Sequence, residues 1–200
     1  MLKQRVITAL IMAALFLLAI AYLPVPALAA IFAVLVLAGG WEWSRMAGGE
    51  SAPTRALFVL VLGAIMAGIY AYCLMGQTPQ KDKVQPILGL ACLWWSFALL
   101  WVKSYPASAG LWNNRVMRSL MGLLILVPAW IAAIYLLTLP QGGILLVVMV
   151  LVTASADIGA FFAGKYLGEH KLAVRVSPAK TWEGFWGGVL ACTLLAVILF

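Results

Sequence analysis

Residues 143–163 read GILLVVMVLVTASADIGAFFA, an apolar run that carries a single charge, at Asp157. A transmembrane helix needs about 20 consecutive apolar residues, so this run is long enough to cross a bilayer. Six further segments have similar length and character: Val6–Leu23, Ala27–Trp43, Leu57–Met75, Pro86–Val102, Leu120–Leu139 and Gly184–Phe200. We therefore predict an all-α protein, a polytopic transmembrane helical bundle of about seven spans.

The composition of the chain also indicates a membrane protein. Of its 200 residues, 66% are hydrophobic and 10% are charged, whereas soluble proteins have roughly 45–50% and 25%. These fractions exclude a soluble domain, a disordered chain, a coiled coil and a secreted disulfide scaffold. Cys73, Cys92 and Cys192 lie in apolar runs without CxxC spacing, so we interpret them as core residues rather than as a redox or metal site.

The first apolar segment also has features of a secretory signal peptide. Lys3 and Arg5 precede the apolar run, and Ala27-Leu28-Ala29 follows it. The run is longer than a signal-peptide core of roughly 7–15 residues. Pro24 and Pro26 are typical of a tight turn between two spans. We therefore expect an uncleaved first span, with a cleaved signal peptide as the alternative.

The basic residues predict the orientation of the chain, because Lys and Arg are enriched in cytoplasmic loops. Counted in alternate loops, eleven of the thirteen fall on one side: Lys3, Arg5, Arg45, Arg55, Lys103, Arg115, Arg118, Lys165, Lys171, Arg175 and Lys180. Lys81 and Lys83 fall on the other side, where Asp82 partly offsets them. We therefore expect a cytoplasmic amino terminus and a cytoplasmic Lys165–Lys180 loop. The net charge of +7 is then mostly a topology signal and does not indicate nucleic-acid binding.

Asp157 is the charged residue that most needs an explanation. Seven uncharged residues separate it from Lys165, which places its carboxylate on the order of 10 Å inside the cytoplasmic boundary if the helix continues. Ionisable groups at such depth are expensive and usually face a cavity, a partner or a metal. We favour a functional role for Asp157; the alternative is a structural ion pair with Lys165 or with an arginine of a neighbouring helix.

The Lys165–Gly188 segment is the second candidate for chemistry. Ser177 followed by Pro178 is a helix-start signal, with Ser as N-cap and Pro at the first helical position. A helix amino terminus suits phosphate, and this one would be surrounded by Lys171, Arg175 and Lys180. We therefore expect the loop to bind a di- or triphosphate or an anionic lipid head group. The alternative is nonspecific binding of anionic lipid.

Few other residues carry a specific signal. For Glu42 we favour a structural role, whereas Glu183 is equally consistent with a capping carboxylate, a lysine partner and a site residue. His170 is the only histidine, which excludes a His-rich metal site, and no P-loop, GxGxxG or HExxH motif is present. Carboxylates together with phosphates favour Mg²⁺ as the metal. A single aspartate supplies too few ligands to bind this ion by itself. Gly184 and Gly188 form a small-xxx-small pair that predicts close packing of helices.

Four motifs together resemble one known family. Residues 155–165 read SADIGAFFAGK, residues 168–172 read GEHKL, residues 177–184 read SPAKTWEG, and Gly187-Gly188 follows. In order and separation these motifs resemble the bacterial phosphatidate cytidylyltransferases, also called CDP-diacylglycerol synthases. The resemblance is specific over about 35 residues; the rest of the chain matches mainly in being polytopic, with Glu42-Trp43 as a weaker echo.

The resemblance implies a reaction and a set of site residues. The family converts CTP and phosphatidic acid into CDP-diacylglycerol and pyrophosphate with Mg²⁺ or another divalent cation, at the cytoplasmic face of the bacterial inner membrane. Asp157 would organise the metal–pyrophosphate site and would be catalytic together with Lys180 and Glu183. The residues expected to bind substrate or phosphate are Lys165, Lys171, Arg175, Ser177 and Thr181. The expected partners are CTP, phosphatidic acid and membrane lipids, without nucleic acid, and a homo-oligomer is left open.

One departure from the family pattern concerns the end of the chain. The family's signature, with a K-R pair, P-G-H-G-G and D-R-x-D, lies after the tryptophan motif and is absent here. We therefore expect an incomplete catalytic unit, inactive in this form, with residues 1–140 as membrane-anchoring spans, 141–188 as a partial catalytic region and 184–200 as an incomplete or minimal last span.

Two rival functions come from other classes. In a transporter or flippase, Asp157 would be a proton or cation relay, but the sequence has no discernible inverted repeat and no second mid-membrane carboxylate. A lipid-binding structural subunit would leave Asp157 without a role.

Overall fold

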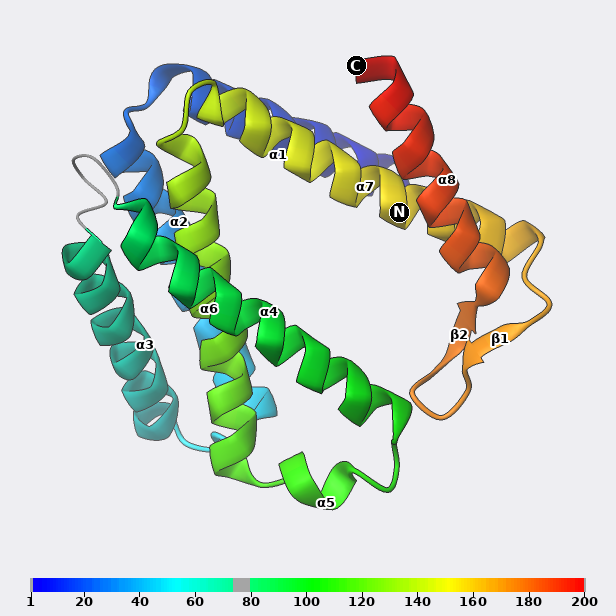
Figure 1. The fold of residues 1–200 in the computed structure, drawn as a ribbon, viewed down its shortest axis with the longest axis horizontal. Helices are drawn as coiled ribbons and strands as arrows, with labels where there is room; N and C mark the ends of the chain where they lie inside the picture. Colours follow the sequence, from blue (N-terminus) through cyan, green and yellow to red (C-terminus); the bar gives the residue numbers. More distant parts are fainter. Residues whose placement is uncertain (1, 74–79, 200) are drawn as a thin grey trace. The chain divides into compact units, whose positions relative to one another are not determined.

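The structure is a computed structural model, and it describes residues 2–73 and 80–199. Most of the described chain is helical, as the apolar runs predict. The elements in chain order are α1 (Leu2–Tyr22), α2 (Val25–Met46), α3 (Ala52–Cys73), α4 (Lys81–Lys103), α5 (Ala109–Trp112), α6 (Arg115–Leu137), α7 (Gly142–Tyr166), β1 (Lys171–Ala173), β2 (Ser177–Thr181) and α8 (Trp182–Leu199). Figure 1 shows these elements along the chain.

Each of the seven predicted spans corresponds to a helix. Within the described residues, six helices are long and apolar enough to cross a membrane, and the apolar part of α1, Ile7–Tyr22, is shorter. The predicted ends at Met75 and Phe200 lie outside the described residues. Some helices begin before the predicted apolar span; for example, α4 begins at Lys81 and holds Pro86 inside the helix. Apolar periodicity could not detect this first turn, which is polar.

The chain forms two compact units. The first comprises Met1–Ser96 and Trp112–Gly143, and the second comprises Phe97–Leu111 and Ile144–Phe200. In the first unit, α2, α3 and α6 pack together around a core that includes Leu62, Ile131 and Ile134. The Trp130 indole Nε1–H donates a buried hydrogen bond of 3.1 Å to the Ala29 carbonyl, which satisfies a polar group that lipid could not.

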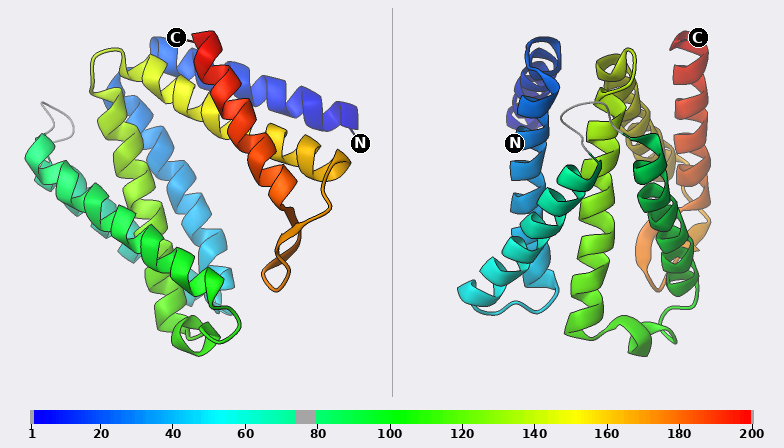
Figure 2. Two further views of the ribbon diagram at one scale, coloured as in Figure 1. Left: turned by 45° about the vertical axis from the view of Figure 1, so that its right-hand side comes forward. Right: turned by 60° about the vertical axis from the view of Figure 1, so that its left-hand side comes forward.

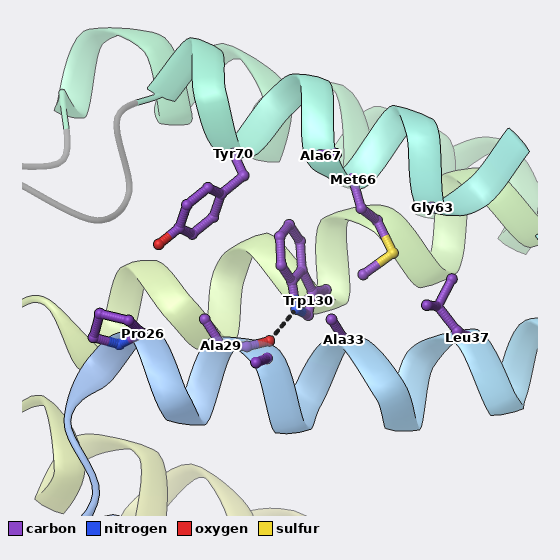
Figure 3. A pocket seen from close by; sticks show the side chains of 10 residues that line it. Pro26, Ala29, Ala33, Leu37, Gly63, Met66, Ala67, Tyr70 and Trp130 are labelled. Atoms are coloured by element: carbon purple, nitrogen blue, oxygen red, sulfur yellow. Dashed lines mark hydrogen bonds between the residues drawn. The ribbon is translucent and has the colours of Figure 1, made fainter. Parts of the chain in front are cut away.

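An apolar cavity of about 400 Å³ lies beside Trp130 in the first unit (Figure 3). Small side chains such as Ala33 and Ala67 line it, and the rings of Tyr70 and Trp130 meet beside them with 6.0 Å between centroids. At the opposite end of α2, Glu42 lies 3.8 Å from an Arg45 nitrogen and 4.0 Å from an Arg55 nitrogen. These contacts agree with the structural role that we favoured for Glu42.

In the second unit, the chain between α7 and α8 forms an antiparallel hairpin rather than a plain loop (Figure 2). Lys171 pairs with Thr181, and Ala173 pairs with Ser177. The prediction that Ser177-Pro178 begins a helix was therefore wrong, because Ser177 is the first residue of β2. The helix begins at Trp182, where the Thr181 hydroxyl accepts a 3.2 Å hydrogen bond from the Gly184 N–H and supplies the N-cap.

Helices α7 and α8 pack closely through small residues, as Gly184 and Gly188 predict. A Cβ atom added at Gly188 would lie 2.9 Å from the Ala156 carbonyl oxygen, and one added at Gly184 would lie 3.0 Å from the Ala160 carbonyl oxygen. Helices associate in lipid through such close approach, because an apolar side chain gains little free energy when it moves from lipid into a contact between helices.

Candidate active site

One pocket of the second unit collects residues from α7, from the hairpin and from the first turn of α8. Its volume is about 690 Å³. Helix α7 supplies Asp157, Ala160, Phe161, Gly164 and Lys165, and the hairpin and α8 supply Leu172, Ala179, Lys180, Thr181, Gly184 and Phe185. The α7 residues have the spacing i, i+3, i+4, i+7 and i+8, which places them on one face of a helix.

The charges of the pocket suit a polyphosphate with a cation. Asp157 is an acid, and Lys165 and Lys180 are bases; all three side chains are exposed within the chain. Among the described residues, no ion pair joins the Asp157 carboxylate to Lys165 or to an arginine, so the structural ion pair that we considered as the alternative is not formed. The carboxylate therefore remains open to a ligand in the pocket.

The Lys165 ammonium is oriented by aromatic rings. It lies 5.7 Å from the ring centroid of Phe161 and 5.4 Å from that of Tyr166, within the range of cation–π attraction. This attraction supports the ammonium without neutralising its charge. Lys165 thus stays available to an anion in the pocket.

Thr181 lines the pocket and connects β2 to the start of α8. Its side chain is 5% exposed, and its hydroxyl caps α8 through the Gly184 N–H. Cβ atoms added at Gly164 and Gly168 would lie 3.3 Å and 2.9 Å from that hydroxyl oxygen. Thr181 is therefore packed between the end of α7 and the start of α8, with its hydroxyl already bonded to the backbone.

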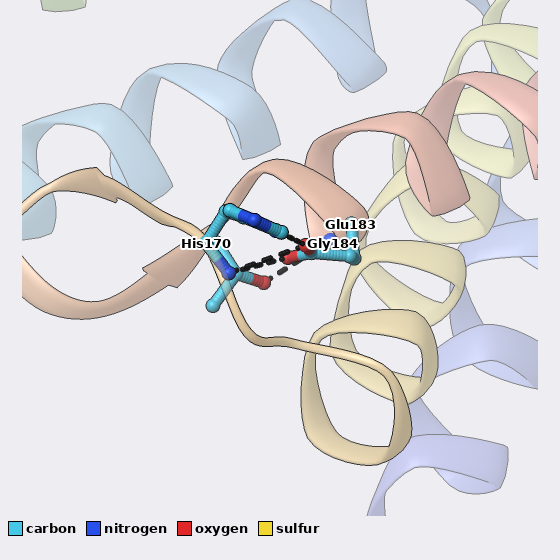
Figure 4. A network of polar contacts seen from close by, with 4 residues as sticks. His170, Glu183 and Gly184 are labelled. Atoms are coloured by element: carbon cyan, nitrogen blue, oxygen red, sulfur yellow. Dashed lines mark hydrogen bonds and ion pairs between the residues drawn. The ribbon is translucent and has the colours of Figure 1, made fainter.

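The structure brings together four of the eight predicted site residues: Asp157, Lys165, Lys180 and Thr181. Lys171 and Arg175 are exposed on the hairpin and do not line the pocket, and Ser177 is half-buried in β2. Glu183 does not line it either. Its carboxylate faces His170 instead (Figure 4): Oε1 is 2.6 Å from His170 Nδ1, and the His170 backbone N–H lies 3.2 Å from both oxygens.

Several of the lining residues were not among the predicted site residues. Phe161 follows Asp157 by one helical turn, a spacing that was visible in the sequence and that could have identified it. Leu172 lies on β1 and Ala179 on β2, and no local sequence pattern predicted the pairing of these strands.

The donor set around Asp157 fits a magnesium ion carried by a nucleotide better than one held by the protein alone. Within residues 2–73 and 80–199, no group of three or more His, Cys, Asp or Glu side chains is placed to hold a metal. Asp157 is the one carboxylate among the pocket residues. Mg²⁺ is often bound by one or two carboxylates together with substrate phosphates and water, and Asp157 can supply that single ligand.

Comparison with known proteins identifies the family. A model of the cytidylyltransferase family matches residues 3–200. The chain belongs to the cytidylyltransferase family. A relative from Pseudomonas aeruginosa named phosphatidate cytidylyltransferase is 42% identical over 190 residues, covering 94% of this chain and 67% of that protein. A relative of the same name from Haemophilus influenzae is 36% identical over 211 residues, covering 99% of this chain and 72% of that protein.

A further relative matches a shorter part of the chain. A phosphatidate cytidylyltransferase from Bacillus subtilis is 52% identical over 44 residues, which is 22% of this chain. No solved structure matches the chain. Members of the cytidylyltransferase family are nucleotidyltransferases, and this chain is accordingly assigned to an enzyme family with several membrane-spanning helices.

Proposed function

We propose that this protein transfers the cytidylyl group of CTP to phosphatidic acid and so produces CDP-diacylglycerol and pyrophosphate. Two relatives that align with most of the chain carry the name of that activity. The observation that carries the proposal is the pocket that places Asp157, Lys165 and Lys180 together at the junction of α7, α8 and the hairpin. The two lysines can bind the phosphate oxygens of both a polyphosphate and a lipid phosphate.

The proposed step is a displacement at phosphorus. An oxygen of the lipid phosphate attacks the α-phosphorus of CTP, a new phosphoanhydride bond forms, and the bond between the α-phosphorus and the bridging oxygen to the β-phosphate breaks. Pyrophosphate leaves with the electron pair of that bond. Catalysis of such steps depends mainly on positioning and on electrostatic stabilisation.

Each charged residue of the pocket has a role in this proposal. Lys165 and Lys180 bind phosphate oxygens and offset the negative charge that grows on the leaving pyrophosphate. Asp157 would hold Mg²⁺ or another divalent cation, which neutralises phosphate charge when it is bound. Lys171 and Arg175, which lie outside the pocket, would attract anionic substrates toward it from the surface of the hairpin.

We propose a location in the bacterial inner membrane with the pocket open to the cytoplasm. The helices support a multi-pass membrane protein, and the distribution of basic residues supports this orientation. CTP is a cytoplasmic nucleotide, so the orientation places the pocket where its substrate is available.

The test is the substitution Asp157→Asn in the full-length protein, assayed in membranes with CTP and phosphatidic acid. We expect turnover to fall at least about 100-fold, which is the order of magnitude of a single electrostatic contribution to catalysis. The substitution keeps the shape of the side chain but removes the charge that would bind the metal. Asp82→Asn, in the first turn of α4, makes the same chemical change outside the pocket and is the matched control. Near-normal turnover in Asp157→Asn would remove Asp157 from the site.

A further inference from the structure

Glu183 and His170 form a compact polar contact beside the pocket (Figure 4). The carboxylate accepts from the His170 backbone N–H at 3.2 Å and lies 2.6 Å from the ring nitrogen Nδ1. A third bond completes the contact, because the Trp182 N–H donates to the His170 carbonyl at 2.9 Å. We call these three interactions the His170–Glu183 clamp.

The clamp joins the residue before β1 to the first residues of α8, and so holds the two ends of the hairpin together. His170 comes directly before β1, and Trp182 and Glu183 begin α8 directly after β2. The first cross-strand pair, Lys171 with Thr181, follows immediately. The strands are only three and five residues long, with an irregularity in their pairing. A two-stranded ribbon of this size is marginally stable by itself, so its base needs support from elsewhere.

Lys180 is the residue that this support affects most directly. It lies on β2 next to Thr181 and lines the pocket, whereas Asp157 and Lys165 lie on α7. The distance between these charges therefore depends on how the hairpin is held against α7 and α8. Thr181 and the packed glycines fix the start of α8, and the clamp fixes the base of the hairpin to that start.

The geometry argues against direct contact between Glu183 and a substrate. Glu183 does not line the pocket, and both carboxylate oxygens accept from His170. His170 itself is largely exposed, with 78% of its side chain accessible. An exposed pair contributes little to the stability of the whole fold, so an effect of the pair on activity would come through position.

We propose that His170 and Glu183 are positioning residues that hold Lys180 over the pocket and thereby set the affinity for the phosphates of CTP. This inference rests on the proposed function, and it gives Glu183 a role different from the catalytic one that its motif suggested. Displacements of about 1 Å in a positioning group can reduce rates on the order of 100-fold. The clamp is small enough that one hydrogen bond can be tested at a time.

The experiment compares His170→Ala with His170→Asn in the full-length protein. Alanine removes the ring contact, whereas the asparagine side-chain amide places an N–H donor close to the position of Nδ1. For His170→Ala we expect kcat/KM for CTP to fall about 10- to 100-fold, mainly through KM for CTP, with KM for phosphatidic acid unchanged. His170→Asn is expected to recover most of the loss. Hydrogen exchange of residues 170–183 reports on the clamp without requiring turnover and should accelerate in His170→Ala alone.

The outcomes separate this inference from the proposed function. Unchanged KM for CTP in His170→Ala, or equal defects in His170→Ala and His170→Asn, would overturn the positioning role. The double variant Glu183→Gln with His170→Ala should be no worse than the more defective single variant, because both substitutions act on the same contact between the His170 ring and the Glu183 side chain. Additive losses would instead indicate that Glu183 acts on the substrate. Absence of CTP turnover in the unmodified full-length protein would overturn the proposed function, and hydrogen exchange would then still reveal whether the clamp holds the hairpin.

Discussion

At the scale of single residues, Lys180 and Lys171 are two lysines of one hairpin with different surroundings. Lys180 lines the pocket with Asp157, whereas Lys171 is exposed and does not line it. We predict that Lys180→Gln lowers kcat/KM for CTP about 10- to 100-fold, because a charge-assisted hydrogen bond to phosphate contributes about 1.5–3 kcal/mol. Lys171→Gln is the matched control and should lower it less than about threefold, the scale of one surface charge. Kinetic assays at two ionic strengths check both, and equal losses would show that the lysines act only through overall charge.

Thr181 and Ser177 show how far single residues could be predicted. Each precedes a segment that resembles the start of a helix, Ser177 with Pro178 and Thr181 with Trp182-Glu183. Both residues belong to β2, but Ser177 is its first residue and Thr181 its last, so only Thr181 directly precedes a helix. The sequence pattern predicted Ser177 as the cap, but the formation of the hairpin moves the start of the helix to Trp182 and leaves Thr181 to cap α8.

At the scale of elements, the α7–α8 contact depends on glycines that leave room for backbone approach. We predict that Gly188→Ala destabilises the protein by about 1–3 kcal/mol, the usual cost of overpacking, because the added Cβ would lie 2.9 Å from the Ala156 carbonyl oxygen. Gly68→Ala in α3 is the matched control, since its Cβ would meet no atom within 4 Å among the described residues, and alanine favours helix more than glycine does. Thermal unfolding in detergent measures both, and a Gly188→Ala protein as stable as the control would contradict the close packing.

The helices and the hairpin were not equally predictable. Long apolar runs predicted every spanning helix because a bilayer requires about 20 apolar residues and internally satisfied backbone bonds. The hairpin has strands of three and five residues, and no apolar alternation marks Lys171–Ala173. Two of the four predicted site residues that line the pocket, Lys180 and Thr181, belong to this element. Its chemistry could therefore be predicted from the residues, whereas its shape required the structure.

At the scale of the whole molecule, the distribution of charge predicts the direction in which the chain crosses the membrane. Eleven of the thirteen basic residues fall in loops of one side, and Lys and Arg are retained in the cytoplasm during insertion. A cysteine replacing the exposed Lys171 should therefore react with a membrane-impermeant maleimide only in inside-out vesicles. A cysteine replacing the exposed Lys81, which lies in the predicted non-cytoplasmic loop, should react only in right-side-out vesicles. Peptide mass spectrometry distinguishes these labels from any on Cys73, Cys92 and Cys192. Labelling of the Lys171 position from the non-cytoplasmic side would reverse the orientation and separate the pocket from cytoplasmic CTP, so this measurement tests the proposed function independently of any substitution in the site.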